Sequence, residues 1–273
     1  MSLSPRLALA ACLLAAAAPP AAASCGGIVV ATGAIAGWAD PATLVLANGT
    51  QVRLDGIEIP PGPPGARYRD AARALAEAHR GTTVTIVAPA RAFDRYGRLR
   101  GHAVLPGTPS ATPATLQQRL LAQGLARVAP RTGGRGCAAT LWPHEGRARR
   151  AKLGLWADPY YDLARAETPQ AALAATGRLA LVEGRIVSVR ESGATIYLNF
   201  GRRWTEDFTV TIAKRDERRF QEAGLEPRRL AGRHVRIRGW IEERGGPWIE
   251  ATQPEQIELV TERAVTKGSV AED

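Results

Sequence analysis

Apolar and polar residues in the first half of the chain follow a pattern that predicts five β-strands and a helix. The strands are expected where apolar and β-branched residues cluster, at 27–35, 42–47, 51–57, 82–88 and 99–105. Asn48-Gly49 is a strong hairpin signal between the second and third strands. Ala71, Leu75 and Ala78 recur at helical spacing and predict a helix over 68–79.

Two more helices are predicted after these strands. They span 116–123 and 142–153, and each is ended by a glycine, Gly124 and Gly154 respectively. Five strands with interspersed helices favour a mainly β fold, a small Greek-key barrel of the OB type with added helices.

The second half of the chain returns to strands after an Ala-rich connector at 163–177, which we expect to be partly helical. Strands are predicted at 179–189, 195–200, 208–212, 234–242, 247–251 and 256–260, and a charged helix at 214–223. Three strands, one helix and two or more strands are again the order of elements in an OB fold. We therefore predict a first domain at 24–162, a second, OB-like barrel at 178–262 and a loose tail at 263–273.

The N-terminus has the features of an export signal over residues 1–23. Arg6 precedes an apolar run from Leu7 to Ala18, and Ala21-Ala22-Ala23 fits the small-residue cleavage rule. The run is too short for a bilayer core of roughly 30 Å, and no later stretch reaches the ~20 apolar residues that a membrane span needs. We expect a periplasmic or secreted protein without a transmembrane segment.

Three cysteines refine this prediction. Cys12 lies in the signal, which leaves Cys25 and Cys137 in the mature chain, and in an exported protein these two most simply form a disulfide. A lipid anchor is the alternative. Leu9-Ala10-Ala11-Cys12 matches a lipoprotein box behind a very short apolar region, and the residues before Cys25 lack the usual leucine.

Net charge divides the chain at the connector. From Ser24 to Ala166 there are 18 Lys and Arg against 9 Asp and Glu, whereas from Glu167 onward there are 17 of each sign. The excess positive charge of the mature chain thus belongs to the first domain. An excess of this kind is typical of a polyanion binder, although an arginine-rich soluble surface would give the same count.

Four motifs in the first domain carry a family resemblance. They are Arg53 to Pro60, Asp94-Arg95-Tyr96-Gly97-Arg98, Gln123-Gly124-Leu125-Ala126-Arg127-Val128, and Glu145-x-x-x-Arg149 leading to Leu153-Gly154-Leu155-Trp156. In this order and spacing, over about residues 30 to 160, they resemble the staphylococcal nuclease (thermonuclease) family. The resemblance implies an OB-type barrel, phosphodiester hydrolysis and a calcium ion.

The resemblance also implies a nucleic-acid site. Arg53 and Arg98 match the two family arginines that grip the scissile phosphate. Planar guanidinium groups suit this role because each one can bind two phosphate oxygens and stays charged. Arg95 and Tyr96 lie in the same turn as Arg98 and complete the predicted nucleic-acid-binding set.

Three positions depart from the family pattern. Glu58 stands where the family has a metal-binding aspartate. The turn Asp40-Pro41-Ala42-Thr43 places Ala42 at another metal-ligand position, and Pro61 stands at the general-base position. A general base is worth roughly 10²–10⁴ in rate. Calcium binding and hydrolysis are therefore both in doubt.

Two other carboxylates could replace the base. Asp55 is two residues from Arg53 and so shares its strand face, and Asp70 lies near the start of the following helix. Both also have structural explanations, because Asp55 could pair with an arginine and Asp70 could favour the helix dipole. Asp55 is the candidate base that we carry forward as speculative.

The second domain is rich in aromatic residues on or beside its predicted strands. They are Tyr197, Phe200, Trp204, Phe208, Trp240 and Trp248. Such residues can form stacking platforms for single-stranded bases, but on a small barrel they more often pack in the core. The zero net charge of this half favours a protein partner over nucleic acid.

Three hypotheses follow for the whole chain. The first is an exported protein with a nuclease-like domain that binds nucleic acid or another phosphate polyanion without hydrolysing it. The second is an active calcium-dependent nuclease with a rearranged site. The third is a non-catalytic envelope interaction protein in which no phosphate site remains.

Overall fold

The computed structural model describes residues 27–61, 65–88, 93–107, 114–131, 135–203 and 205–260, and the first of its two β-rich units is built on a closed barrel. The barrel order is β1-β2-β3-β6-β5, with β1 at Ile28–Asp40, β2 at Thr43–Leu46, β3 at Gln51–Leu54, β5 at Thr83–Ala88 and β6 at Leu99–Val104. β3 and β6 pair in parallel, and the other neighbours pair antiparallel. The predicted OB-type barrel is confirmed.

β1 closes this barrel because it is long and irregular. It pairs with β5 through its first half and with β2 through its second half. Its register with β2 shifts between Ile35 and Gly37 and again between Trp38 and Asp40. Such irregularities bend a strand and increase its twist. The second shift lies at the end of the strand, where Asp40 is paired with Thr43 across the turn.

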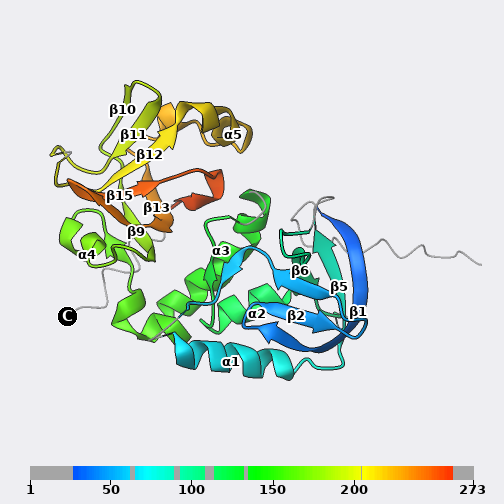
Figure 1. Ribbon diagram of the computed structural model, residues 1–273. Helices are drawn as coiled ribbons and strands as arrows, with labels where there is room; N and C mark the ends of the chain where they lie inside the picture. Colours follow the sequence, from blue (N-terminus) through cyan, green and yellow to red (C-terminus); the bar gives the residue numbers. More distant parts are fainter. Residues whose placement is uncertain are drawn as a thin grey trace, which may run out of the picture.

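Three helices pack against the barrel (Figure 1). α1 spans Ala66–Glu77 and buries Tyr68, Ala72 and Ala76. The helix is as predicted, but its buried face is shifted by one residue from the pattern that starts at Ala71, which is exposed. The alanine-rich sequence explains the shift, because alanines on every side leave the apolar face poorly defined.

α2 and α3 complete the helical layer of the first unit. α2 spans Leu116–Ala122 and begins with a capping box in which the side chain of Thr115 accepts from the N–H of Gln118. α3 spans Arg135–Arg150, so it begins well before the predicted residue 142 and contains Pro143. A proline is typical of a helix start, and for that reason the sequence placed the start too late.

The second unit contains two sheets. One has the order β10-β11-β12-β15-β14, and the other β16-β13-β9-β8. The strands that follow the connector are β9 at Leu179–Arg185, β10 at Ser188–Ser192, β11 at Thr195–Asn199, β12 at Thr209–Ala213, β13 at His234–Trp240, β14 at Glu242–Arg244, β15 at Gly246–Glu250 and β16 at Ile257–Leu259. The charged segment forms the short helix α5 at Glu217–Glu222. The parallel pairing of β12 with β15 repeats that of β3 with β6.

The connector between the units is partly helical, as expected, and also contains a short strand. β8 at Ala164–Arg165 adds to the sheet of the second unit by pairing in parallel with β9, and α4 follows at Pro169–Leu173. Among the described residues, none of the helices combines the length and the apolar character that crossing a bilayer requires.

Each unit has its own apolar core, and a third, smaller cluster lies where they meet. Tyr68, Leu155, Trp156 and Tyr161 of the first unit pack in this cluster with Leu181 of β9. Figure 1 shows α3 lying on the side of the first unit that faces the second. The two units therefore share a packed junction.

Candidate functional site

A tight turn between β5 and β6 positions Arg98. Asp94 Oδ1 accepts hydrogen bonds from the N–H groups of Tyr96 at 2.9 Å and Arg98 at 3.0 Å, and Gly97 has a positive φ of 75° that favours glycine. Asp94 Oδ2 accepts from Arg98 Nε at 2.8 Å. Burial raises the pKa of Asp94, but the hydrogen bonds from Arg98 and Tyr96 outweigh it and hold the pKa below its ordinary value.

Arg98 and Arg53 converge on one carboxylate. Asp40 Oδ1 accepts from Arg53 Nη1 at 3.1 Å, and Asp40 Oδ2 lies 3.4 Å from Arg98 Nη1. The three side chains come from the ends of β1, β3 and the turn before β6, and are between 24% and 37% exposed. We call Arg53 and Arg98 the arginine clamp. The predicted pair is thus brought together, at a place that solvent reaches.

The sequence did not assign a role to Asp40, although it lies in the turn compared with the family. Its Oδ1 also accepts from the N–H of Ala42 at 2.8 Å, which fixes the side chain within its own turn. The signal that could have found it is the pairing of β2 with β3, which places Thr43, three residues after Asp40, opposite Arg53.

The other candidate carboxylates near the clamp are each paired with a different arginine. Asp55, the speculative base, accepts a hydrogen bond from Arg100. Glu58, at the metal position, accepts from Arg127 Nη2 at 2.8 Å, because β4 (Ile57–Glu58) pairs with β7 (Arg127–Val128). Both side chains are therefore already held by a cation.

The residues present do not fit the calcium site that the resemblance implies. Ala42 is buried and offers no side-chain ligand, and Glu58 is committed to Arg127. Within the described ranges, His, Cys, Asp and Glu side chains form no group of three or more that could hold a metal ion. Pro61 is exposed and has no group that could act as a base.

The turn that carries Arg98 also presents aromatic surface. Tyr96 is 66% exposed and Phe93 is 71% exposed. The guanidinium groups of Arg95 and Arg98 lie 4.7 and 5.1 Å from the centre of the Tyr96 ring. An exposed ring flanked by two cations beside the clamp is a suitable contact for a polyanion that carries planar groups. This arrangement agrees with the predicted roles of Arg95 and Tyr96 without testing them.

A buried ion-pair network joins the two units. Arg238 on β13 is fully buried and donates to Glu145 on α3 at 3.1–3.2 Å, to the carbonyl of Val128 at 3.1 Å and to Glu258 at 3.2 Å. Glu145 also accepts from the N–H of Val128 at 2.7 Å and lies 3.9 Å from Arg149. The motif acid Glu145 thus serves the junction between the units.

The network extends into the second unit and balances its charges. Arg236 donates to Glu258 at 2.8 Å and to Glu183, which also accepts from Arg165 at 3.0 Å. Burial is the largest single influence on the pKa of Glu183 and raises it. The charges of Arg236 and Arg165 and the hydrogen bond from Arg236 together lower the pKa by more, so that it lies below the ordinary value. Each of the buried arginines Arg149, Arg236 and Arg238 lies within ion-pair distance of at least one carboxylate, as buried charges require.

Stability is expected to fall in acid because of this network. Burial raises the pKa of Glu145, but the charges of Arg238 and Arg149 and hydrogen bonds lower it more, so the folded-state pKa lies below the ordinary 4.5. A depressed carboxylate pKa stabilises the fold above that value, and the contribution is lost as pH falls through the folded-state pKa. Thermal unfolding between pH 7 and pH 3 should show a falling Tm below about pH 4.5. A shallower fall in Glu145→Gln would locate the effect, and a Tm constant to pH 3 would contradict it.

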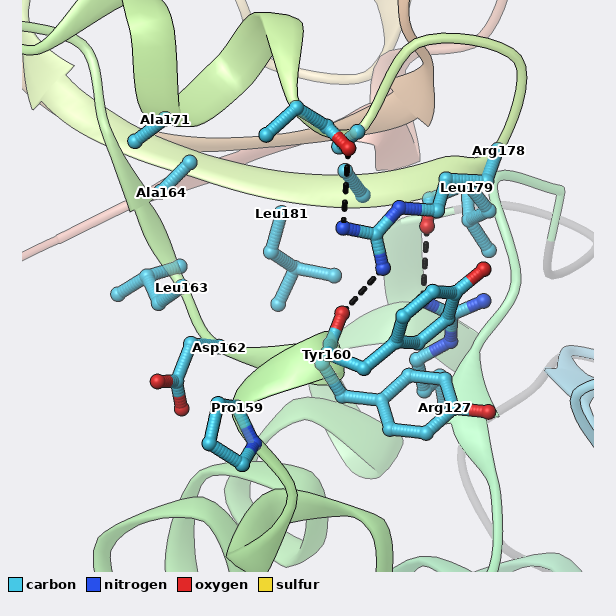
Figure 2. Close-up of a pocket in the computed structure, with 14 residues that line it drawn as sticks. Arg127, Pro159, Tyr160, Asp162, Leu163, Ala164, Ala171, Arg178, Leu179 and Leu181 are labelled. Carbon is cyan, nitrogen blue, oxygen red and sulfur yellow. Dashed lines mark hydrogen bonds between the residues drawn. The ribbon is translucent and has the colours of Figure 1, made fainter. Parts of the chain in front are cut away.

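A pocket of about 240 Å³ also lies at the junction (Figure 2). Arg127 donates to the carbonyl of Leu179 at 2.8 Å, and its guanidinium lies 5.3 Å from the ring centre of Tyr161. Arg178 donates to the carbonyl of Tyr160 and lies 3.8 Å from the centre of its ring. Both arginines are therefore engaged in holding the junction together.

The aromatic residues of the second unit divide into two groups. Phe200 and Phe208 are buried with ring centres 4.9 Å apart, which is core packing. Tyr197 and Trp248 are half-buried and meet edge to face at 6.0 Å, while Trp240 is 55% exposed. Trp204 lies outside the described residues, as does Cys25, whereas Cys137 is buried on α3. The predicted disulfide therefore stays a prediction.

Comparison with protein families matches residues 51–158 to the staphylococcal nuclease homologue family. No match was found among curated proteins. The matched range contains both clamp arginines, Glu58, Pro61 and Glu145, and excludes the second unit.

Several solved structures are similar to part of the chain. The extended Tudor domain of Drosophila melanogaster Tudor-SN (p100) is 21% identical, with 39% of this chain and 47% of that chain covered and a TM-score of 0.29. An aspartyl tRNA synthetase from Entamoeba histolytica is 15% identical, with 32% and 19% covered and a TM-score of 0.24. A chain described as an aspartyl-tRNA synthetase from Leishmania major Friedlin is 10% identical, with 37% and 21% covered and a TM-score of 0.27. The chain spans less than half of each of these structures.

Proposed function

We propose that this chain, whose residues 51–158 match the staphylococcal nuclease homologue family, binds nucleic acid or another phosphate polyanion at the arginine clamp without hydrolysing it. The observation that carries this proposal is the convergence of Arg53 and Arg98 on the two oxygens of Asp40. Two guanidinium groups that already hold one anion from two sides are arranged to hold a phosphate in the same way.

The surroundings of the clamp support binding over hydrolysis. Hydrolysis needs a water activated by a carboxylate, or by a metal ion with hard oxygen ligands. Pro61 and Ala42 supply neither group, and Asp55 and Glu58 are each paired with an arginine. The positively charged first domain would attract a polyanion to the exposed clamp.

Export and an OB-like second unit belong to the same proposal. The signal-like residues 1–23 support a periplasmic or secreted location, which N-terminal sequencing of the exported protein would test by finding Ser24 first. The parallel pairing of β12 with β15 supports an OB-like second unit. Because β13 of that unit supplies Arg238 to the junction, we assign the unit a role in holding the first domain.

Replacing Arg53 with alanine is expected to weaken binding of a single-stranded oligonucleotide with a 5′-phosphate by about ten- to a hundredfold, the value of one or two hydrogen bonds to a charged group. Fluorescence anisotropy with the purified mature protein at low salt measures the loss. Arg98→Ala should show a similar change, because both arginines contact the same anion.

Arg244→Ala is the matched control. Arg244 is half-exposed and paired with Glu242 in the second unit, so its removal takes away the same charge at a distance from the clamp. Equal losses in Arg53→Ala and Arg244→Ala would show that binding depends on total charge alone. No binding by the unsubstituted protein would overturn the proposal and leave an interaction protein.

An active nuclease is the second candidate, and Asp40 is the observation that favours it. Its carboxylate lies within hydrogen-bond distance of Arg53, so a base could act beside a bound phosphate. Digestion of DNA and RNA, with calcium and with chelator, decides between the two candidates. Cleavage that is lost in both Arg53→Ala and Asp40→Asn would establish the nuclease. Cleavage no faster than that of Arg53→Ala excludes it.

A further inference from the structure

Asp40 occupies one nitrogen of each clamp guanidinium. Its two oxygens contact Nη1 of Arg53 and Nη1 of Arg98, one oxygen to each guanidinium. A phosphate held by the same N–H groups would place two of its oxygens where the Asp40 oxygens now lie. Binding to these groups therefore requires displacement of Asp40.

The clamp carries no net charge while Asp40 is bound. The two guanidinium charges are offset by Asp40 and by Asp94, which accepts from Arg98 Nε at 2.8 Å. Asp55, two residues after Arg53 in the chain, is paired with Arg100 and adds no net charge. The four groups Arg53, Arg98, Asp40 and Asp94 are thus neutral together, and Arg95 at the Tyr96 ring is a further cation beside them.

The charge of an incoming ligand decides whether replacing Asp40 in the clamp is favourable. An internal phosphodiester carries one negative charge, the same as Asp40, so the exchange leaves little electrostatic gain to offset the cost of association. A terminal phosphate carries about 1.5 to 2 negative charges at pH 7 and three strong acceptor oxygens. Only the terminal phosphate offers the clamp more than Asp40 does.

We propose that Asp40 is an internal competitor that restricts the clamp to ligands with a terminal phosphate group, such as the phosphorylated end of a nucleic-acid strand or a nucleotide. This inference rests on the proposed function of the clamp. Internal phosphodiesters bind there weakly because they do not outcompete the carboxylate. Asp40 thereby determines which phosphate the clamp accepts.

The position of Asp40 in its turn makes it an effective competitor. The N–H of Ala42 donates to Asp40 Oδ1 at 2.8 Å, so the carboxylate is held beside the arginines by its own backbone. Its side chain is 37% exposed, and a ligand can therefore reach it from solvent. Asparagine keeps an Oδ1 acceptor for Ala42 but loses the negative charge, so Asp40→Asn removes the competitor and preserves the turn.

The test uses three single-stranded oligonucleotides of one sequence that end in a 5′-phosphate, a 5′-methyl phosphodiester or a 5′-hydroxyl. The unsubstituted protein should bind the 5′-phosphate strand about tenfold more tightly than the methyl-capped strand. In Asp40→Asn, affinity for all three strands should rise, and the methyl-capped strand should gain about tenfold. Arg53→Ala should lose the preference for the 5′-phosphate.

Glu77→Gln is the matched control. Glu77, the last residue of α1, is 37% exposed, as Asp40 is, and pairs with Arg80 beyond the helix end, so its substitution changes the net charge equally away from the clamp. An equal gain in Glu77→Gln and Asp40→Asn would attribute the effect to total charge and overturn the inference. Circular dichroism of both variants verifies the fold.

The remaining outcomes separate this inference from the function on which it rests. If Arg53→Ala weakens binding but Asp40→Asn changes no affinity, the clamp binds anions and Asp40 is no competitor. If neither substitution changes binding, the clamp itself is not the site. A nucleoside monophosphate that displaces the 5′-phosphate strand at equal concentration identifies a free nucleotide as the ligand, whereas much weaker displacement identifies the strand end. Both of these results support the terminal-phosphate class.

Discussion

Replacing Arg238 with methionine is expected to lower the free energy of unfolding by about 3–5 kcal/mol, the cost of removing one partner from a buried ion pair. Arg238 is completely buried, and its substitution leaves Glu145 and the carbonyl of Val128 without their donor from the second unit. Methionine fills a similar volume, so the loss is mainly electrostatic. Urea unfolding followed by circular dichroism at pH 7 measures it.

Two further variants make the Arg238 result specific. Arg244→Met removes a half-exposed arginine paired with Glu242, and should cost less than about 1 kcal/mol. Adding Glu145→Gln to Arg238→Met should recover at least about 1 kcal/mol, because the uncompensated buried charge is then gone. A change below about 1 kcal/mol in Arg238→Met would show that the junction contributes little to stability.

Replacing Gly124 with alanine is the second large expected effect, a loss of about 2–5 kcal/mol. Gly124 has a φ of +66°, which costs a residue with a Cβ roughly 1–2 kcal/mol. An added Cβ would also lie 2.0 Å from the carbonyl oxygen of Leu153, so the backbone would have to move, at a further cost of about 1–3 kcal/mol. Urea unfolding again measures the change.

Gly177→Ala is the control for Gly124→Ala. Gly177 has a φ of +77° but no atom within 4 Å of an added Cβ, so it should cost only the roughly 1–2 kcal/mol of the backbone conformation. The difference between the two variants isolates the backbone contact. Equal losses would mean that the loop at Leu153 moves away freely.

Gly124 and Gly154 show how much of the local structure could be predicted from the sequence. Gly124 and Gly154 were predicted as helix ends, and both have positive φ, but only Gly124 directly follows the end of a helix, because α3 ends at Arg150 and Gly154 begins the short 3₁₀ helix Gly154–Ala157. The sequence did not show that they meet. The N–H of Leu155 donates to the carbonyl of Gly124 at 2.8 Å, and a Cβ on either glycine would overlap backbone of the other segment. Two motifs far apart in the chain are thus one packing unit.

The sequence predicted the arginines of the candidate site better than the acids that pair with them. Arg53 and Arg98 were identified from motif spacing, and the structure brings them together. Asp40 was not expected to contact them, and Asp55 and Glu58 were considered for catalysis before their arginine partners were known. An arginine within a motif is visible along the chain, but the acid that it meets depends on strand register.

The sequence was enough to predict the main strands along the chain, the OB-type barrel of the first domain and the clamp arginines, because these depend on local periodicity, turn residues and short motifs. Only the tertiary structure decided the partners of those residues: Asp40 in the clamp, Arg127 at Glu58, and Arg238 from the second unit at Glu145. Charges separated by 13, 69 and 93 residues are paired by strand register and domain packing, which short-range patterns do not encode.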